Sequence, residues 1–319
     1  MENKILSIVV PVHNEHDTID KFYSTIQSLE LGRDITIEYV FADDGSTDDT
    51  LDILKRLHKM DSVVHYTSFS RNFGKEAGLY AGLQRAQGDY VTVMDVDLQD
   101  PPELLPQMLQ LVREQKYDVV ATRRANRKGE AIIRSWFSKQ FYKVMNKISD
   151  VPLVDGARDY RIMTRQVVDS LLKLSENQRF SKGMFNWVGF KVKYISFENV
   201  PSSGGVSSWS FWSLSKYAVQ GIVSFSTVPL TVITYIGITT FLMSIISAIF
   251  VVIRAVIYHN SASGWASMVT IMLFIGGIQL LSLGVIGRYL SSIFLEVKDR
   301  PIYITCLLYT SPSPRDMRR

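Results

Sequence analysis

The chain has 319 residues, a formal net charge of +4 and a single cysteine. This length fits one large soluble domain plus a smaller unit, and the charge is too small to indicate a nucleic-acid partner. The lone Cys306 excludes an internal disulfide framework and is typical of a reducing compartment. The N-terminus has only a short apolar run without a small-residue cleavage site, so we expect no signal peptide there.

Apolar, β-branched runs alternate with amphipathic segments in the first part of the chain. The runs predict buried strands at residues 5–12, 37–42 and 63–68, and in a fourth run that begins at Val91. Strands that alternate with helices predict a parallel α/β sheet. Ligands bind such sheets at the carboxyl ends of the strands. Polar residues follow all four runs, so we expect a ligand site at this edge.

The fourth run ends in alternating carboxylates and a double proline, which cannot continue a strand ladder. Asp95, Asp97 and Gln99 alternate, so in an extended chain their side chains would share one side. Three oxygen ligands at a strand end predict a site for Mg²⁺ or Mn²⁺ that carries substrate phosphates. An isolated Asp-x-Asp is more often a solvated acidic turn, but the position of this one among polar strand ends favours the metal site.

A basic stretch that includes Arg123 follows a fifth predicted strand at residues 117–122. Residues 132–148 are a predicted helix in which Arg134 and Ser138 lie among aromatic side chains. A basic, aromatic helix is typical of a membrane surface or a phosphate contact. The alternative is an ordinary amphipathic helix with a solvated basic face.

Two further elements complete the polar part of the chain. A helix is predicted from Arg165 to about residue 174, and residues 191–197 alternate like an edge strand. The Gly/Ser-rich residues 201–208 then predict a loop at the boundary of the soluble domain.

The last third of the chain is far more apolar. Residues 209–226 have aromatic side chains and few charges, which predicts a helix in the bilayer interface. Residues 227–253 and 265–286 carry no charge, and each stretch is about long enough to cross a bilayer as a helix. We therefore expect a transmembrane hairpin rather than two buried helices of a soluble protein. Basic residues flanking the hairpin place both of its ends in the cytoplasm.

The predicted organisation is a catalytic α/β domain, a linker with an interface helix, a transmembrane hairpin and a cytoplasmic tail, at residues 1–200, 201–226, 227–290 and 291–319. Residues 306–319 (CLLYTSPSPRDMRR) match neither the apolar part nor the soluble part. We interpret them as a non-native frameshift, read-through or assembly scar and leave them out of the fold prediction. An uninterrupted native frame at the 3′ end of the gene would remove this hypothesis.

Several short motifs occur in order: residues 10–15 (VPVHNE), 43–48 (DDGSTD), 71–75 (RNFGK), 95–102 (DVDLQDPP), 159–161 (DYR), 177–180 (NQRF) and 187–190 (WVGF). Together they closely resemble the family 2 glycosyltransferases that glycosylate polyprenyl phosphate. The nearest subgroup resembles the bacterial bactoprenol glycosyltransferases with two C-terminal transmembrane helices, and the likeness covers about residues 5–304. The Gln-x-x-Arg-Trp motif of processive synthases does not occur, which disfavours polymer synthesis.

The resemblance implies a GT-A (Rossmann-like) fold with a nucleotide-sugar donor. It implies donor contacts at Pro11, Asn14, Glu15, Asp43, Asp44, Lys75, Asp95 and Val96. It implies a divalent cation, Mg²⁺ or Mn²⁺, at Asp95, Asp97 and Gln99. Similarity to dolichyl-phosphate mannose synthases implies acceptor-phosphate contacts at Arg123, Arg134 and Ser138. Asp97 and Asp159 are the implied catalytic residues.

The resemblance also implies an inverting transfer of a hexose to undecaprenyl phosphate at the cytoplasmic face of a bacterial plasma membrane. The acceptor phosphate has a second pKa near ~6 and is already mostly ionised at neutral pH, so we expect Asp159 to orient groups rather than to act as a general base. The subgroup favours UDP-glucose or UDP-N-acetylhexosamine and a role in cell-wall or surface glycans. A GDP-mannose-dependent polyprenyl-phosphate mannose synthase is the alternative. Relatives also suggest a homo-oligomer.

One departure from the family pattern lies in the loop at residues 202–208. Relatives usually carry Arg-x-x-Gly-Glu-Ser/Thr there, whereas this chain has SSGGVSS. The arginine position corresponds to Ser202 and the glutamate position to Val206. A catalytically impaired, membrane-bound homologue is therefore a further alternative.

Overall fold

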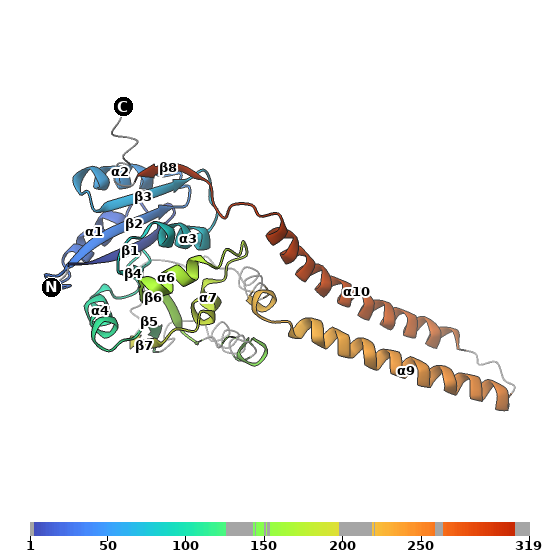
Figure 1. Ribbon diagram of the computed structural model, residues 1–319. Helices are drawn as coiled ribbons and strands as arrows, with labels where there is room; N and C mark the ends of the chain where they lie inside the picture. The colour runs from blue at the N-terminus through green and yellow to red at the C-terminus, as the bar shows by residue number, and fades with distance from the viewer. Residues whose placement is uncertain are drawn as a thin grey trace.

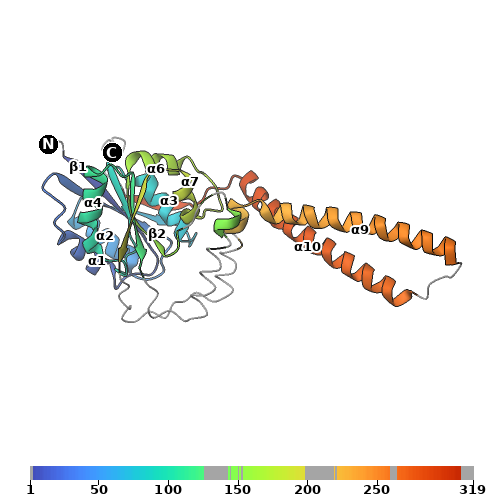
Figure 2. The ribbon, with the colours of Figure 1, turned by 90° about the horizontal axis from the view of Figure 1, so that it is seen from below.

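An α/β domain carries a long arm of two helices (Figures 1 and 2). The computed structural model describes residues 3–125, 143, 145–149, 151, 154–197, 219, 221–258 and 264–309. The predicted helices at residues 132–148 and 209–226 lie largely outside these described residues, as does the loop at residues 202–208.

The α/β domain is built on one mixed sheet of eight strands in the order β7-β5-β6-β4-β1-β2-β3-β8. The strands are β1 Lys4–Val12, β2 Ile35–Asp43, β3 Val64–Phe69, β4 Tyr90–Val93, β5 Val119–Arg124, β6 Ala157–Thr164, β7 Val192–Phe197 and β8 Thr305–Tyr309. The strands β4, β1, β2 and β3 are mutually parallel neighbours. Their carboxyl ends therefore share one edge of the sheet, as predicted.

The prediction of a wholly parallel sheet was wrong at β6. This strand runs antiparallel to both of its neighbours, β4 and β5. Its first five residues include Arg158, Asp159 and Arg161, so it lacks the apolar run by which a buried strand is recognised. The edge position predicted for residues 191–197 is confirmed, since β7 lies at one end of the sheet.

Helices cover both faces of the sheet (Figure 2). In the described part they are α1 Ile19–Gln27, α2 Thr50–Met60, α3 Lys75–Arg85, a short 3₁₀ turn η1 Pro102–Leu104, α4 Leu105–Glu114, α6 Arg165–Leu172 and α7 Ser181–Trp187. One hydrophobic core joins α1, α2 and α4 to the sheet, and a second joins α3, α6 and α7 to the opposite face. The helix α3 lies so close to β1 that a Cβ on Gly82 would be 2.3 Å from Val9 Cγ1. This close packing sets the position of Lys75 at the start of α3.

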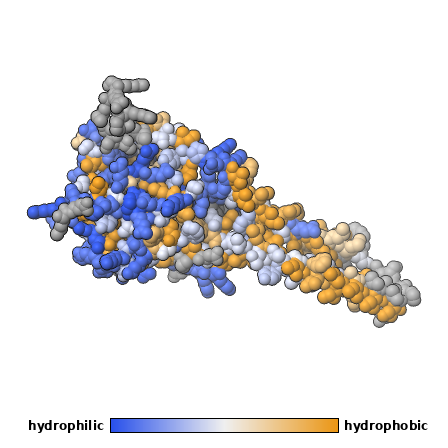
Figure 3. Space-filling model, in the orientation of Figure 1, coloured by the Kyte–Doolittle hydropathy of each residue, from blue (hydrophilic) through white to orange (hydrophobic). Residues whose placement is uncertain are grey.

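The arm consists of α9 Val228–Tyr258 and α10 Trp265–Val297, which run side by side away from the domain (Figures 1 and 2). Both are long and apolar enough to cross a membrane, over Val228–Val251 and Ile271–Val297. Their surface is mostly apolar, whereas the domain surface is mixed with many polar residues (Figure 3). The first helix continues past the uncharged stretch that ends at residue 253 and ends at Tyr258, because the apolar pattern resumes after Arg254.

The C-terminal tail contributes a strand to the sheet. Residues Thr305–Tyr309 form β8, which pairs antiparallel with β3. The prediction that left residues 306–319 out of the fold is therefore wrong for residues 306–309. The open backbone edge of β3 pairs with extended segments of many sequences, so this contact does not bear on the origin of the tail, and the scar interpretation stays a prediction.

Candidate active site

Polar loops from four strands meet at the carboxyl edge of the sheet. The loop after β1 carries Asn14 and Glu15, and the end of β2 carries Asp43 and Asp44. The loop after β3 leads to Lys75, and Asp95 follows β4. This arrangement is the one that the alternation of strands and helices predicts for a ligand site.

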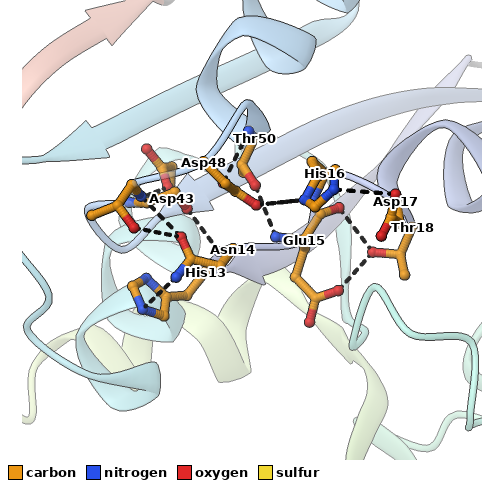
Figure 4. Close-up of polar contacts among 11 residues, drawn as sticks. His13, Asn14, Glu15, His16, Asp17, Thr18, Asp43, Asp48 and Thr50 are labelled. Atoms are coloured by element: carbon orange, nitrogen blue, oxygen red, sulfur yellow. Dashed lines mark hydrogen bonds and ion pairs between the residues drawn. The ribbon is translucent and has the colours of Figure 1, made fainter. Parts of the chain in front are cut away.

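The loops after β1 and β2 hold each other in place (Figure 4). The Asn14 N–H donates to Ser46 Oγ at 2.9 Å, and Asn14 Oδ1 accepts from the Thr47 N–H at 2.9 Å. The Glu15 N–H donates to Thr50 Oγ1 at 2.8 Å. Asn14 has φ 55°, a conformation that asparagine tolerates better than most residues. The two loops therefore form one hydrogen-bonded unit beside the sheet edge.

Asp43 and Asp44 bind groups of the chain itself. Asp43 is fully buried and accepts from the Ser46 N–H at 3.0 Å and from Ser68 Oγ at 2.7 Å. Asp44 accepts from the Phe73 and Gly74 N–H groups at 2.6 and 2.8 Å. Burial raises the pKa of Asp44 even though these two hydrogen bonds oppose it. Both carboxylates thus position the loops of β2 and β3, and their contact with a donor stays a prediction.

Lys75 joins two strands by bridging two carboxylates. Its Nζ lies 2.7 Å from Asp95 Oδ1, after β4, and 2.9 Å from Asp159 Oδ2, on β6. The carboxylates are about four-fifths covered, while the lysine side chain is 45% exposed. The two carboxylates predicted as donor-binding and catalytic are therefore brought together by a third predicted residue, the ammonium of Lys75.

The charges of this bridge keep Lys75 and Asp159 ionised at neutral pH. Burial alone would lower the pKa of Lys75, but the Asp159 and Asp95 carboxylates outweigh it and raise that pKa. Burial alone would raise the pKa of Asp159, but the ammonium of Lys75 and then that of Lys182 hold it below its ordinary value. Asp159 is thus ionised at neutral pH, and an electrostatic or orienting role requires this charge.

The Asp-x-Asp segment forms a turn instead of an extended chain. The prediction that the side chains of Asp95, Asp97 and Gln99 share one side of an extended chain was therefore wrong. The strand β4 already ends at Val93, and Leu98 has φ 53°. The Gln99 N–H donates to Asp97 Oδ1 at 3.1 Å, which closes a local turn. The reason is that an aspartate side chain competes with the strand ladder for nearby backbone N–H groups.

The side chains of this turn point in different directions. Asp97 is exposed, Asp95 is half-buried, and Val96 is 3% exposed and belongs to the hydrophobic core. A donor could therefore contact Val96 only through its backbone. Burial raises the pKa of Glu15, and the negative charges of Asp97 and Asp95 raise it further. Glu15 and the turn thus share one acidic face at the sheet edge.

This acidic face fits a divalent cation that is shared with a substrate. No group of three His, Cys, Asp or Glu side chains in the described part of the chain is placed to hold a metal by itself. Mg²⁺ is commonly held by one or two carboxylates while substrate phosphates supply the remaining oxygens. The oxygen atoms of Asp95, Asp97 and Gln99 suit that mode. A bound cation would also weaken the repulsion between the carboxylates of Asp95 and Asp97 and that of Glu15.

The predicted acceptor-phosphate residues are described only in part. Arg123 lies on β5, and its Nε donates to Ser196 Oγ of β7 at 2.8 Å. Its side chain is exposed, so the remaining guanidinium N–H groups face outward. Arg134 and Ser138 lie outside the described residues.

Two buried contacts next to the site were not predicted. Arg158 Nε donates to Asp100 Oδ1 at 2.7 Å, and Asp100 is only 4% exposed. Glu76, which follows Lys75, accepts from both the N–H and the hydroxyl of Ser181 at the start of α7. Partners more than fifty residues apart leave no local signal in the sequence. The only signal in the sequence was that Glu76, Asp100 and Arg158 are charged residues within or next to the recognised motifs.

Comparisons with known proteins agree with this geometry. The family model for Glycosyl transferase family 2 matches residues 7–172. A chain named as a glycosyltransferase, CsbB of Bacillus subtilis (strain 168), is 43% identical over 304 residues, which cover 95% of this chain and 92% of that one. The SfII prophage-derived bactoprenol glucosyl transferase of Shigella flexneri is 38% identical over 299 residues, 94% of this chain and 96% of that one.

Among solved structures, glucosyl-3-phosphoglycerate synthase from Mycobacterium tuberculosis, determined with Mn²⁺, UDP-glucose and phosphoglyceric acid, has a TM-score of 0.46 and 19% identity. The match covers 69% of this chain and 78% of that one, and so low a score carries no argument about ligands. The family model and the two relatives carry the assignment: the chain belongs to glycosyl transferase family 2 and is a glycosyltransferase.

Proposed function

We propose that the protein transfers a hexose, with inversion, from a nucleotide sugar to polyprenyl phosphate at the cytoplasmic face of a bacterial membrane. The observation that carries the proposal is the Lys75 bridge between Asp95 and Asp159 at the carboxyl edge of the sheet. It supplies a positive charge among carboxylates at the edge where a diphosphate would bind. The similarity to a bactoprenol glucosyl transferase supports the lipid acceptor and a glucosyl donor. The choice of a UDP-sugar follows from the motifs that resemble that subgroup.

The donor would bind across the hydrogen-bonded unit of the loops after β1 and β2 and the turn after β4. Asn14, Glu15 and Asp43 would lie beside the base and ribose, and Asp95 and Asp97 would lie beside the diphosphate. We assign the divalent cation to Asp95, Asp97 and Gln99. When bound, Mg²⁺ or Mn²⁺ stabilises the negative charge of the departing nucleoside diphosphate.

The reaction is a displacement at the anomeric carbon of the sugar. An oxygen of the acceptor phosphate forms a bond to that carbon, the bond to the diphosphate oxygen breaks, and the electron pair leaves with the nucleoside diphosphate. The acceptor needs little general-base help because its second pKa is near ~6. Asp159 therefore orients Lys75 and stabilises positive charge that develops on the sugar, and Lys75 faces the diphosphate.

The two apolar helices support the choice of a lipid acceptor. They leave the domain together and would hold the bilayer surface close to it, with the domain in the cytoplasm (Figure 1). Arg123, with its outward-facing guanidinium, would contact the acceptor phosphate together with Arg134 and Ser138.

Incubation of membranes containing the full chain with undecaprenyl phosphate and a panel of labelled nucleotide sugars tests the proposal. We expect a single labelled lipid from a UDP-hexose, loss of labelling with a metal chelator and recovery on addition of Mg²⁺ or Mn²⁺. Membranes with Asp97→Ala are the matched control. Labelling from GDP-mannose alone would favour the mannose synthase instead, and absence of any labelled lipid would contradict the proposal.

A catalytically impaired homologue is the second candidate, favoured by the sequence of the loop at residues 202–208. Such a protein would bind a UDP-sugar in a metal-dependent way without releasing sugar in the presence of lipid. If the missing loop arginine limits turnover, the double change Ser202→Arg and Val206→Glu raises donor consumption. No gain from this double change would remove the explanation.

A further inference from the structure

A polar pocket lies where the helical arm meets the α/β domain. The pocket is small and partly open to solvent, and the described residues that line it are Gln178, Val223, Arg288, Ser291 and Ser292. Four of these five side chains are polar, although three of them belong to the otherwise apolar helix α10. The donor and acceptor positions assigned above do not include any of them.

Hydrogen bonds between α10 and the loop before α7 hold the walls of this pocket. The Glu296 carboxylate accepts from the Asn177 N–H at 3.0 Å and from the Gln178 N–H at 3.2 Å. Ser292 Oγ donates to Gln178 Oε1 at 3.1 Å. Because the amide oxygen of Gln178 is the acceptor, its NH₂ group remains available as a donor toward the pocket.

Arg288 is the only cation among the lining residues, and its position along α10 places it at a membrane surface. The helix rises by ~1.5 Å per residue, so Arg288 lies about 35 Å along it from Trp265. A bilayer core is roughly 30 Å thick. The guanidinium is exposed, and the described part of the chain contains no carboxylate in an ion pair with it. At this surface an unpaired guanidinium is attracted to anionic lipid headgroups.

We propose that this pocket binds the phosphate headgroup of a membrane lipid. Arginine offers planar, paired N–H donors to phosphate oxygens, and the Ser291 hydroxyl and the Gln178 amide add two donors beside it. The pocket adjoins the apolar face of the arm, which favours a lipid over free phosphate as the source. This inference rests on the membrane position stated under the proposed function, and polyprenyl phosphate is the lipid that this function supplies.

The loop that forms one wall of the pocket also leads to the catalytic edge. It continues from Gln178 to Ser181, which donates to Glu76 on α3. Glu76 is adjacent to Lys75, the centre of the bridge at the sheet edge. A headgroup in the pocket would therefore lie on a loop that is hydrogen-bonded at one end to α10 and at the other to the catalytic helix.

Lipid binding to the full-length protein in neutral detergent tests the proposal without any nucleotide sugar. Native mass spectrometry would compare polyprenyl phosphate with phosphatidylglycerol, and inorganic phosphate would be added as a competitor. We expect Arg288→Gln to weaken lipid binding about tenfold, as for the loss of one charged contact, and Arg288→Lys to restore part of it. Arg300→Gln, which removes the same charge beyond the end of α10, is the matched control and should change binding less than about twofold.

The proposal is supported if Arg288→Gln weakens the binding of polyprenyl phosphate or phosphatidylglycerol. The lipid that binds more tightly to the wild type is then the one whose headgroup the pocket accepts. Unchanged lipid binding in Arg288→Gln overturns it, as does inorganic phosphate that displaces both lipids completely at equal concentration. Donor binding by Arg288→Gln reports whether the variant is folded. If Arg288-dependent lipid binding persists but no nucleotide sugar yields a glycolipid, the proposed function fails and the pocket assignment stands.

Discussion

The α/β domain and the helical arm use the same apolar residue types in opposite ways. In the domain, Phe22 and Leu54 are fully buried against the sheet. In the arm, Leu273 and Phe274 are 72% and 68% exposed. Within the described residues, other side chains cover Phe22 and Leu54 but leave Leu273 and Phe274 exposed. The apolar surface of the arm therefore needs an apolar environment (Figure 3). The same apolar residue types thus make a core in one region and an exposed apolar surface in the other.

Charged residues show the same contrast. In the domain, charges at and beside the site are paired within the chain, as in Lys75 with Asp159 and Arg158 with Asp100. On α10, Glu296 binds backbone N–H groups of the domain, and Arg288 lines the polar pocket beside them. These polar side chains of α10 thus lie where the two regions meet.

The largest effect is expected from removal of an Asp-x-Asp carboxylate. Asp97→Ala should lower single-turnover sugar transfer about 10³-fold, as for loss of one group that stabilises the transition state. Asp159→Asn should retain at least about tenfold more activity, because the acceptor is already ionised and Asp159 only orients charge. Rapid-quench measurement of the labelled glycolipid compares the two. Equal losses would show that Asp159 acts as a true general base.

A carboxylate placed on the arm tests the contrast between the two regions directly. Leu273 and Met60 are almost equally exposed, at 72% and 71%, but one lies on α10 and the other at the end of α2. Leu273→Asp should cost about 3 kcal/mol in membrane insertion, whereas Met60→Asp should stay within about 0.5 kcal/mol. The measurement is the fraction of protein left in alkali-washed membranes. Equal retention of both variants would mean that α10 does not face lipid.

The Lys75 bridge gives a pH dependence with a defined sign. The pKa of Asp159 lies below its ordinary value, so in the wild type this carboxylate stays ionised well into the acid range. In Lys75→Met, burial raises the pKa of Asp159 and the largest opposing charge is lost, with Lys182 and Arg161 left to lower it, so the acid limb of kcat/KM moves toward neutral pH. We expect a loss of about 10²-fold at pH 7 as well.

The control for this pH profile is Lys55→Met, which removes a partly exposed lysine of α2 whose ammonium pairs with Asp52. Its acid limb should match the wild type. The same acid limb in Lys75→Met and wild type would contradict the assignment of the bridge.

The smallest effect is expected where the two regions touch. Glu296→Gln weakens the acceptor of the Asn177 and Gln178 N–H groups. A loss of about 1 kcal/mol corresponds to roughly fivefold faster amide exchange at these two positions. Hydrogen exchange read at single residues checks it, with the exposed Glu30→Gln as the control. Unchanged protection of both amides would show that the arm and the domain are not coupled through this contact.

Much of the fold could be predicted because it rests on local patterns. Apolar runs located β1, β2 and β3 to within two residues at each end, and the uncharged stretches located both helices of the arm. The strand β6 was missed because Arg158, Asp159 and Arg161 interrupt its apolar pattern. The turn after β4 was mistaken for extended chain because hydrogen bonding by Asp97, rather than periodicity, shapes it.

The sequence by itself determined the family, the α/β order of elements and the polar strand ends, since each of these depends on residues that are neighbours in the chain. Only the tertiary structure decided that Lys75 lies between Asp95 and Asp159, the second of them 84 residues away. It also decided that α10 closes a polar pocket with the loop before α7. Such contacts are set by how strands and helices pack, and packing brings together residues whose spacing along the chain carries no signal of their meeting.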